Sequence, residues 1–155
     1  TKNIIAIAAG ISDGLGFGDN TKASLMTRGL AEMTRLGTAL GAKAPTFSGL
    51  AGMGDLIVTC ISPHSRNRAV GERLGQGLDL DAIMEDSPMV AEGVLNSKAF
   101  HELARERNVK VPITDNVYEV LYRGKDPTES VRELMTREAT EEIQEATLLP
   151  PDRTV

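Results

Sequence analysis

Residues 26–41 read MTRGLAEMTRLGTALG, and this stretch carries the clearest helical signal in the chain. Its large apolar side chains recur at intervals of three and four residues, which places them on one face of an α-helix. Gly41 follows the last of them, where a glycine commonly ends a helix because it adopts positive φ angles without strain. We therefore predict a helix that begins near Asp19-Asn20. Its inward face comprises Met26, Leu30, Met33, Leu36 and Leu40.

Helical spacing also occurs on both sides of this stretch. Residues 4–15 place Ile4, Ile7, Ile11 and Leu15 at helical intervals, and Pro45 can open a short helix at its first position. Three glycines predict turns over residues 49–54, whereas residues 55–60 fit either a strand or a buried helix. Further helices are predicted over residues 65–75, 79–86, 92–108, 112–124, 126–137 and 138–145. Their inward residues include Leu95, Ala99, Leu103, Val117, Val120, Leu121, Val131, Leu134 and Met135.

Alternating strand patterns joined by hairpin turns are missing from the sequence. The chain is therefore predicted to be all-α, with about seven or eight helices. We expect one helical domain over residues 1–145 and a loose tail over residues 146–155. Because the chain begins at Thr1 and enters an apolar segment at once, we also expect it to be a piece of a longer protein.

The composition of the chain argues against several classes of protein. The chain has 155 residues, of which 41% are hydrophobic and 25% charged, a balance that argues against global disorder. A net charge of −5 argues against a general nucleic-acid binder and against adhesion to an anionic membrane. The longest apolar run, residues 4–11, is far shorter than the roughly 20 residues that span a bilayer. The single cysteine excludes an internal disulfide and fits a reducing cytoplasm.

A basic island in this acidic chain is the best local candidate for a binding site. It reads Ser65-Arg66-Asn67-Arg68, and Arg73 follows it. If Ser65 caps a helix, then backbone N–H groups, the positive end of the helix dipole and a guanidinium converge, which is an arrangement that binds phosphate. The same pattern also fits a solvated surface turn, and local reasoning leaves both interpretations open.

Two other motifs are weaker candidates for a binding or catalytic site. The glycine-rich stretches 14–18 and 52–54 do not complete a G-x-G-x-x-G fingerprint, so they are interpreted as helix breaks that allow close packing. Cys60 and His64 could form a thiol–imidazole pair, but Pro63 interrupts a helix between them, and a buried structural cysteine is the favoured interpretation. No cluster of residues predicts a metal site.

Several short motifs nevertheless occur in one order along the chain. They are KNIIAIAAG (2–10), DG (13–14), TRGLAEM (27–33), GLAGMGDL (49–56), TC (59–60), SRNR (65–68), GQG (75–77), VAEG (90–93) and PIT (112–114). Together they resemble the bacterial NAD(P)-dependent glycerol-3-phosphate dehydrogenases. The resemblance implies the C-terminal, substrate-binding domain of that family, with an all-α fold similar to that of the 6-phosphogluconate dehydrogenase C-terminal domain. This agrees with the independent prediction of helices.

The resemblance also implies roles for individual residues. Lys2 matches the catalytic lysine, which accepts a proton when glycerol 3-phosphate is oxidised and returns one when dihydroxyacetone phosphate is reduced. Asn3 would help to position the substrate. Asp55 matches an acidic residue near the lysine, and Thr59 a hydroxyl in the same wall of the site.

The basic island matches the phosphate-binding turn of that family, with Ser65, Arg66 and Asn67 as its residues. Arg66, Val90 and Glu92 would touch the cofactor, NAD or NADP, which binds mainly to an N-terminal domain that this chain lacks. We therefore expect a cytoplasmic enzyme of glycerophospholipid synthesis, without nucleic-acid or membrane partners, of which this chain alone is inactive.

Two rival hypotheses belong to other classes. A stand-alone helical module could bind a phosphorylated small molecule through the same basic island. A structural domain could instead form a homodimer through Ile4, Ile7 and Ile11, if these side chains were exposed.

Overall fold

The structure is a computed structural model that describes residues 1–86 and 91–137. Every regular element within these ranges is helical, which confirms the predicted all-α class. In chain order the elements are α1 (Lys2–Gly14), α2 (Asp19–Ala39), α3 (Pro45–Ser48), the π-helical turn η1 (Leu50–Gly54), α4 (Asp55–Ile61), α5 (Arg66–Gly75), α6 (Leu80–Glu85), α7 (Glu92–Glu106), α8 (Pro112–Arg123) and α9 (Pro127–Thr136).

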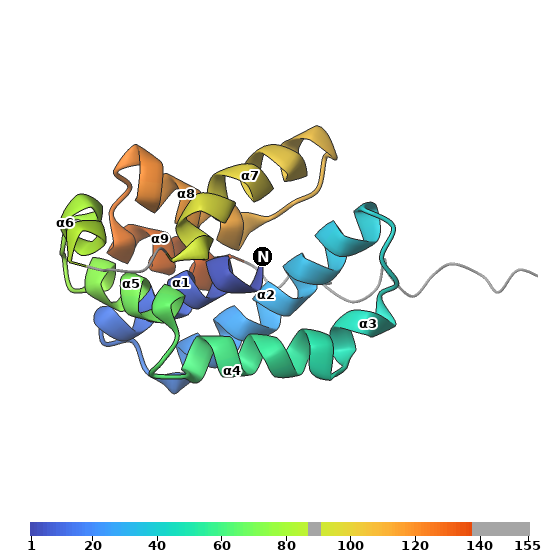
Figure 1. The fold of residues 1–155 in the computed structure, drawn as a ribbon, viewed down its shortest axis with the longest axis horizontal. Helices are drawn as coiled ribbons and strands as arrows, with labels where there is room; N and C mark the ends of the chain where they lie inside the picture. Colours follow the sequence, from blue (N-terminus) through green and yellow to red (C-terminus); the bar gives the residue numbers. More distant parts are fainter. Residues whose placement is uncertain (87–90, 138–155) are drawn as a thin grey trace, which may run out of the picture.

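Helix α1 runs through the middle of the bundle, with α7 and α8 on one side and α4 on the other (Figure 1). All its residues from Ile4 to Ser12 are buried, because helices pack against it from several directions. A helix in this position is apolar around its whole circumference rather than along one stripe. The homodimer surface predicted through Ile4, Ile7 and Ile11 is therefore wrong, since these side chains fill the chain's own core.

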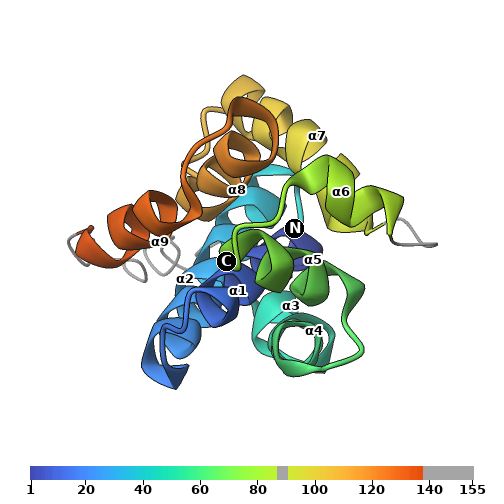
Figure 2. The same cartoon turned by 90° about the vertical axis from the view of Figure 1, so that its left-hand side faces the viewer.

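Helices α1 and α5 lie side by side and touch through their backbones (Figure 2). A Cβ atom built on Gly10 would lie 2.0 Å from the carbonyl oxygen of Arg68, and one built on Gly14 would lie 2.1 Å from that of Glu72. Gly71 of α5 approaches the α1 backbone equally closely. Gly10 meets Arg68, and four residues further along α1 Gly14 meets Glu72, which is four residues further along α5. The two helices therefore run parallel. Their N-termini, which carry the positive ends of the helix dipoles, therefore point toward the same end of the bundle.

Local signals placed most helix ends correctly. Gly41 and Gly124 adopt φ angles of +92° and +70° just after α2 and α8, as predicted for helix-ending glycines. The side chains of Ser65 and Asp126 each accept a hydrogen bond from the backbone three residues later, so both are N-caps, and both stand where a helix was predicted to begin.

The stretch 49–54 differs from its prediction. It forms the turn η1, which leads directly into α4, rather than a series of turns. A Cβ on Gly52 would lie 2.1 Å from the carbonyl oxygen of Phe47, so this glycine lets η1 pack onto the backbone of the preceding helix. Residues 55–60, which fitted either strand or helix, belong to α4.

The inward face of α7 also differs from its prediction. Leu95 is 64% exposed and Ala99 is exposed as well, whereas Val94 and the small residues Gly93, Ser97 and Ala104 are buried. The helix lies so close to α1 at Gly93 that small residues suit the contact better than a leucine stripe. Leu40, predicted to face inward at the end of α2, is 45% exposed.

Some predictions fall on other parts of the chain. The helix predicted over residues 138–145 and the tail predicted over residues 146–155 lie outside the described residues. Within the described ranges, no helix combines the length and apolar content that crossing a membrane requires.

Candidate functional site

Four helices present predicted site residues at one end of the bundle. Lys2 and Asn3 begin α1, Asp55 begins α4, and Glu92 begins α7. The turn Ser65–Asn67 begins α5, whose parallel packing against α1 brings the two helix starts to the same side. The cofactor residue predicted at Val90 lies outside the described residues.

Lys2 and Asp55 form a direct ion pair. Lys2 Nζ lies 2.5 Å from Asp55 Oδ2, and the two side chains are 38% and 44% exposed. Thr59, one turn further along α4, donates from Oγ1 to the backbone oxygen of Asp55 at 2.6 Å. The three predicted residues therefore come together, and the pair stays open enough for a ligand to reach the Lys2 amine.

Asn3 and Glu92 connect the starts of α1 and α7. Asn3 Nδ2 donates to Glu92 Oε2 at 3.2 Å. This contact joins a residue predicted to position the substrate with one predicted to touch the cofactor. The residue predicted to position the substrate and the residue predicted to touch the cofactor therefore lie next to each other where α1 and α7 begin.

The predicted phosphate turn has the expected helical geometry. Ser65 is extended, with φ −72° and ψ 109°, and its Oγ accepts from the backbone N–H of Arg68 at 3.3 Å. Arg66 and Asn67 therefore occupy the first turn of α5. The side chain of Asn67 is buried, and its Oδ1 accepts from the backbone N–H of Gly93 at 2.8 Å.

An open hollow of about 270 Å³ lies against this turn. Its lining comprises Val58, Thr59, Ser62, His64, Ser65, Arg66 and Asn67. Four of these were predicted as site residues, and their hydroxyl, guanidinium and amide groups suit an anion at a helix N-terminus. Ser62 and His64 were not predicted here, and only their position just before the N-cap could have indicated them.

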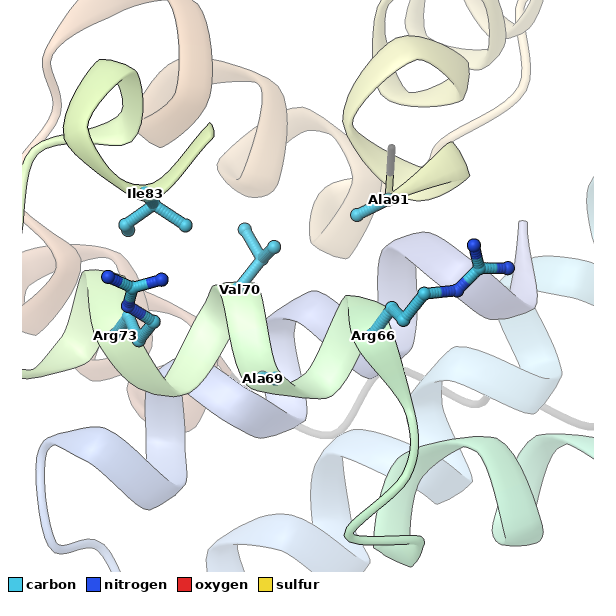
Figure 3. Close-up of a pocket in the computed structure, with 6 residues that line it drawn as sticks. All are labelled: Arg66, Ala69, Val70, Arg73, Ile83 and Ala91. Carbon is cyan, nitrogen blue, oxygen red and sulfur yellow. The ribbon is translucent and has the colours of Figure 1, made fainter. Parts of the chain in front are cut away.

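A smaller hollow of about 100 Å³ lies along α5. Figure 3 shows its apolar lining, in which Val70 of α5 faces Ile83 and Ala91, with Arg73 at one end and Arg66 at the other. The guanidinium of Arg66 points away from these apolar residues, whereas Arg73 pairs with Asp86 at 2.9 Å. Because it is small and largely apolar, this hollow is a poor candidate for a phosphorylated ligand.

The two arginines of the basic island, Arg66 and Arg68, lie in different surroundings. Arg68 Nη2 lies 2.8 Å from Asp13 Oδ2, and Lys22 pairs with the same carboxylate at 2.6 Å. These largely buried ion pairs connect α5 with α1 and α2. Arg68 therefore serves the fold, and Arg66 is the arginine of the island that lines the larger hollow.

Cys60 belongs to the core, as the favoured interpretation expected. It is fully buried on α4, and this burial raises the pKa of its thiol to about 12. A cysteine in this environment is a poor nucleophile. Among the described residues, no group of three or more His, Cys, Asp or Glu side chains is arranged to hold a metal ion.

Comparisons with known proteins agree with this geometry. Residues 1–132 match the family described as NAD-dependent glycerol-3-phosphate dehydrogenase C-terminus. The glycerol-3-phosphate dehydrogenase (NAD(P)+) of Geobacillus kaustophilus is 61% identical over 144 residues, which are 93% of this chain and 42% of the relative. The enzyme of that name from Chlorobium limicola is 58% identical over 142 residues, covering 92% of this chain and 43% of the relative.

Solved structures show the same relationship. The glycerol-3-phosphate dehydrogenase of Coxiella burnetii superposes with a TM-score of 0.86 at 45% identity, covering 88% of this chain and 42% of that one. The enzyme from Saccharomyces cerevisiae gives a TM-score of 0.77 at 26% identity, covering 88% of this chain and 40% of that one. The chain thus spans well under half the length of these relatives. It belongs to the NAD-dependent glycerol-3-phosphate dehydrogenase C-terminal family, as the sequence motifs predicted.

Proposed function

We propose that this chain is the substrate-binding and catalytic-lysine part of an NAD(P)-dependent glycerol-3-phosphate dehydrogenase. The enzyme would interconvert sn-glycerol 3-phosphate and dihydroxyacetone phosphate in the cytoplasm and so supply glycerophospholipid synthesis. One observation carries the proposal. Thr59 lines the larger hollow, and it also donates a hydrogen bond to the backbone of Asp55, which is the ion-pair partner of Lys2. A phosphate site and a proton-transfer group are therefore neighbours. The family match favours this function over a stand-alone binding module.

The phosphate would bind in the hollow at the start of α5. Arg66 supplies a guanidinium, Ser65 a hydroxyl and Asn67 an amide, and all three line the hollow. The positive end of the α5 dipole adds to their attraction for an anion. Charge-assisted hydrogen bonds of this kind are about twice as strong as neutral ones.

Lys2 would move the proton of the reacting hydroxyl. During oxidation, once the Lys2 ammonium has released a proton to solvent, Nζ takes up the hydroxyl proton while the hydride leaves the carbon, so that the C–O bond becomes a carbonyl. Asp55 holds Nζ in place and stabilises the ammonium that forms. In the reverse direction the ammonium returns the proton to the ketone oxygen. The nicotinamide cofactor, when bound, supplies or accepts the hydride.

The described residues fit only one side of a dinucleotide. Arg66 and Glu92 are exposed at the starts of α5 and α7, and with Val90 they would form edge contacts to NAD or NADP. A hollow of about 270 Å³ suits a three-carbon phosphate ester rather than a dinucleotide. We therefore propose that the chain alone binds substrate but does not turn it over.

Titration of the ¹⁵N-labelled chain with sn-glycerol 3-phosphate tests the phosphate site. We expect saturable amide shifts at Ser65–Asn67, none with glycerol, and a loss of affinity of at least about tenfold in Arg66→Ala. Arg73→Ala is the matched control, because Arg73 lies on the same helix but pairs with Asp86. Equal losses in the two variants, or equal binding of glycerol, would contradict the proposed site.

A second comparison tests the dehydrogenase against a general phosphate-binding module. If Lys2 contacts the glycerol hydroxyls, then Lys2→Met weakens binding of glycerol 3-phosphate but leaves binding of inorganic phosphate unchanged. If both ligands are affected equally, or neither is, Lys2 does not meet the reacting part of the substrate.

A further inference from the structure

Gly93 lies where three helices of the site meet. A Cβ built on it would lie 2.7 Å from Asn67 Oδ1, 2.8 Å from the backbone oxygen of Asn3 and 2.9 Å from Ile7 Cδ1. Asn3 and Ile7 belong to α1, and Asn67 to α5. The Asn3 contact is with backbone, which cannot turn aside, so only glycine fits here without displacing the start of α7.

The backbone N–H of Gly93 has a specific partner. Gly93 is the second residue of α7, and N–H groups in the first turn of a helix have no partner within the helix. This N–H donates to Asn67 Oδ1 at 2.8 Å in a buried hydrogen bond. The Asn67 side chain thus caps α7 from a neighbouring helix.

This bond determines which way the Asn67 amide faces. An asparagine amide has an acceptor end, Oδ1, and a donor end, Nδ2, and a flip of the side chain exchanges them. A backbone N–H can only donate, so it selects Oδ1 as its partner. The Nδ2 end is then the one able to donate to an anion in the hollow that Asn67 lines. The flipped amide would present an oxygen to the anion and repel it.

We propose that Gly93 is a positioning residue of the phosphate site, whose backbone N–H holds Asn67 Oδ1 and so directs Nδ2 toward the bound phosphate. The inference rests on the proposed function, because it assigns the hollow to the phosphate of the substrate. It also explains why α7 approaches α1 and α5 so closely at a glycine. Gly93 itself makes no contact with the ligand.

The first experiment compares Gly93→Ala with the unaltered chain by NMR. In the unaltered chain we expect the Gly93 amide to be protected from exchange, and the Asn67 side-chain Nδ2 signals to shift on saturation with sn-glycerol 3-phosphate. In Gly93→Ala the Asn67 side-chain signals should move without ligand, and the Kd should rise at least about tenfold. Ser65 and Arg66 should still respond at higher concentration, a selective pattern that a general loss of structure would not produce.

Gly18→Ala is the matched control. Gly18 has φ −71° and no atom within 4 Å of a built Cβ, so the same substitution there should change the Kd by less than about twofold. A second variant, Asn67→Asp, keeps an acceptor for the Gly93 N–H but replaces the donor with a carboxylate oxygen. It should retain protection of the Gly93 amide and lose binding of glycerol 3-phosphate by more than about tenfold, whether or not Gly93→Ala folds.

The outcomes separate this inference from the proposed function. If the unaltered chain shows no saturable shifts at Ser65–Asn67, the proposed function fails and the inference fails with it. If the unaltered chain binds but folded Gly93→Ala binds equally well, only the role of Gly93 is overturned. An unprotected Gly93 amide, or normal binding by Asn67→Asp, also overturns that role alone.

Discussion

The contact between α1 and α5 and the arm formed by η1 and α4 (residues 50–61) both contain glycines, but the two regions differ in the room that these glycines leave for a side chain. In the contact, Gly10 and Gly71 let two backbones meet, and no side chain fits between them. In the arm, Gly52 also packs onto backbone, but Gly54 has room for a methyl group. The contact is enclosed by the core, whereas the arm exposes large apolar side chains such as Leu50, Val58 and Ile61.

The candidate site takes residues from both regions. Lys2, Asn3 and Asn67 belong to the helices of the contact, whereas Asp55 and Thr59 belong to the arm. Backbone contacts of this kind leave little freedom, while an arm buried along only one face opens more easily. We infer that the phosphate turn and Lys2 are fixed by the contact, and that Asp55 is placed against them by the less firmly held arm.

The largest expected effect separates the glycines of the two regions. Gly71→Ala places a Cβ 2.0 Å from the carbonyl oxygen of Ile7, so the helices must separate, and we expect a loss of about 4 kcal/mol of unfolding free energy. Gly54→Ala, at helical angles with ordinary contacts, should gain about 0.5 kcal/mol. Urea denaturation of both variants measures the difference, and similar values for the two would remove the distinction between the regions.

Glu32 gives the next largest effect, again within the enclosed part of the molecule. This buried carboxylate on α2 accepts from the backbone N–H groups of Ile113 and Thr114 at 2.8 and 2.9 Å and so caps α8. Glu32→Ala removes the acceptor of three buried donors, the two N–H groups and the Thr114 hydroxyl, and we expect a loss of about 3 kcal/mol. Thr59→Val in the arm, which removes one local hydrogen bond, should lose about 1 kcal/mol. Calorimetric unfolding of both variants would reveal any reversal of this order.

The pH dependence of the unfolding free energy tests whether the buried Cys60 anchors the arm in the core. Burial raises its pKa from about 9 to about 12, so the folded state favours the neutral thiol. The stability that follows is complete below pH 9 and is lost as the pH rises toward 12. At pH 11 this loss amounts to about 3 kcal/mol, and a Cys60→Ala variant should lack it. Urea midpoints at pH 8 and 11 for both proteins check the sign, and parallel losses would show that other groups cause them.

Sequence reasoning succeeded where a signal is local. The caps at Ser65 and Asp126, the glycine after α2 and the all-α class each depend on residues within a few positions of one another. It failed where a distant backbone decides the outcome, as when Gly52 packs onto Phe47 and turns residues 50–54 into a π-helical turn. The prediction of the inward face of α7 was wrong for the same reason, because the close contact of α7 with α1 favours small residues over leucines.

The candidate site shows the same division. Local physics indicated the phosphate turn, because a cap, a helix start and an arginine are adjacent in sequence. The roles of Lys2 and Asp55 came from the family resemblance, since spacing alone cannot show that residues 53 positions apart form an ion pair. The hydrogen bond between Gly93 and Asn67 had no sequence signal at all. The structure supplies the placement of these residues, and their roles in catalysis stay predictions.

The smallest expected effect lies on the outer face of the arm. Ile61 is 52% exposed, whereas Leu56 on the same helix is 1% exposed. Leu56→Ala should therefore lose about 3 kcal/mol, and Ile61→Ser less than about 0.5 kcal/mol. Urea denaturation at low protein concentration provides the measurement. A loss above about 1 kcal/mol for Ile61→Ser would mean that this face is covered in solution, and sedimentation of both proteins would then show whether a second copy covers it. If instead the loss is negligible, the arm is held by its Leu56 face alone, and Asp55 and Thr59 reach the site from a segment with a single buried side.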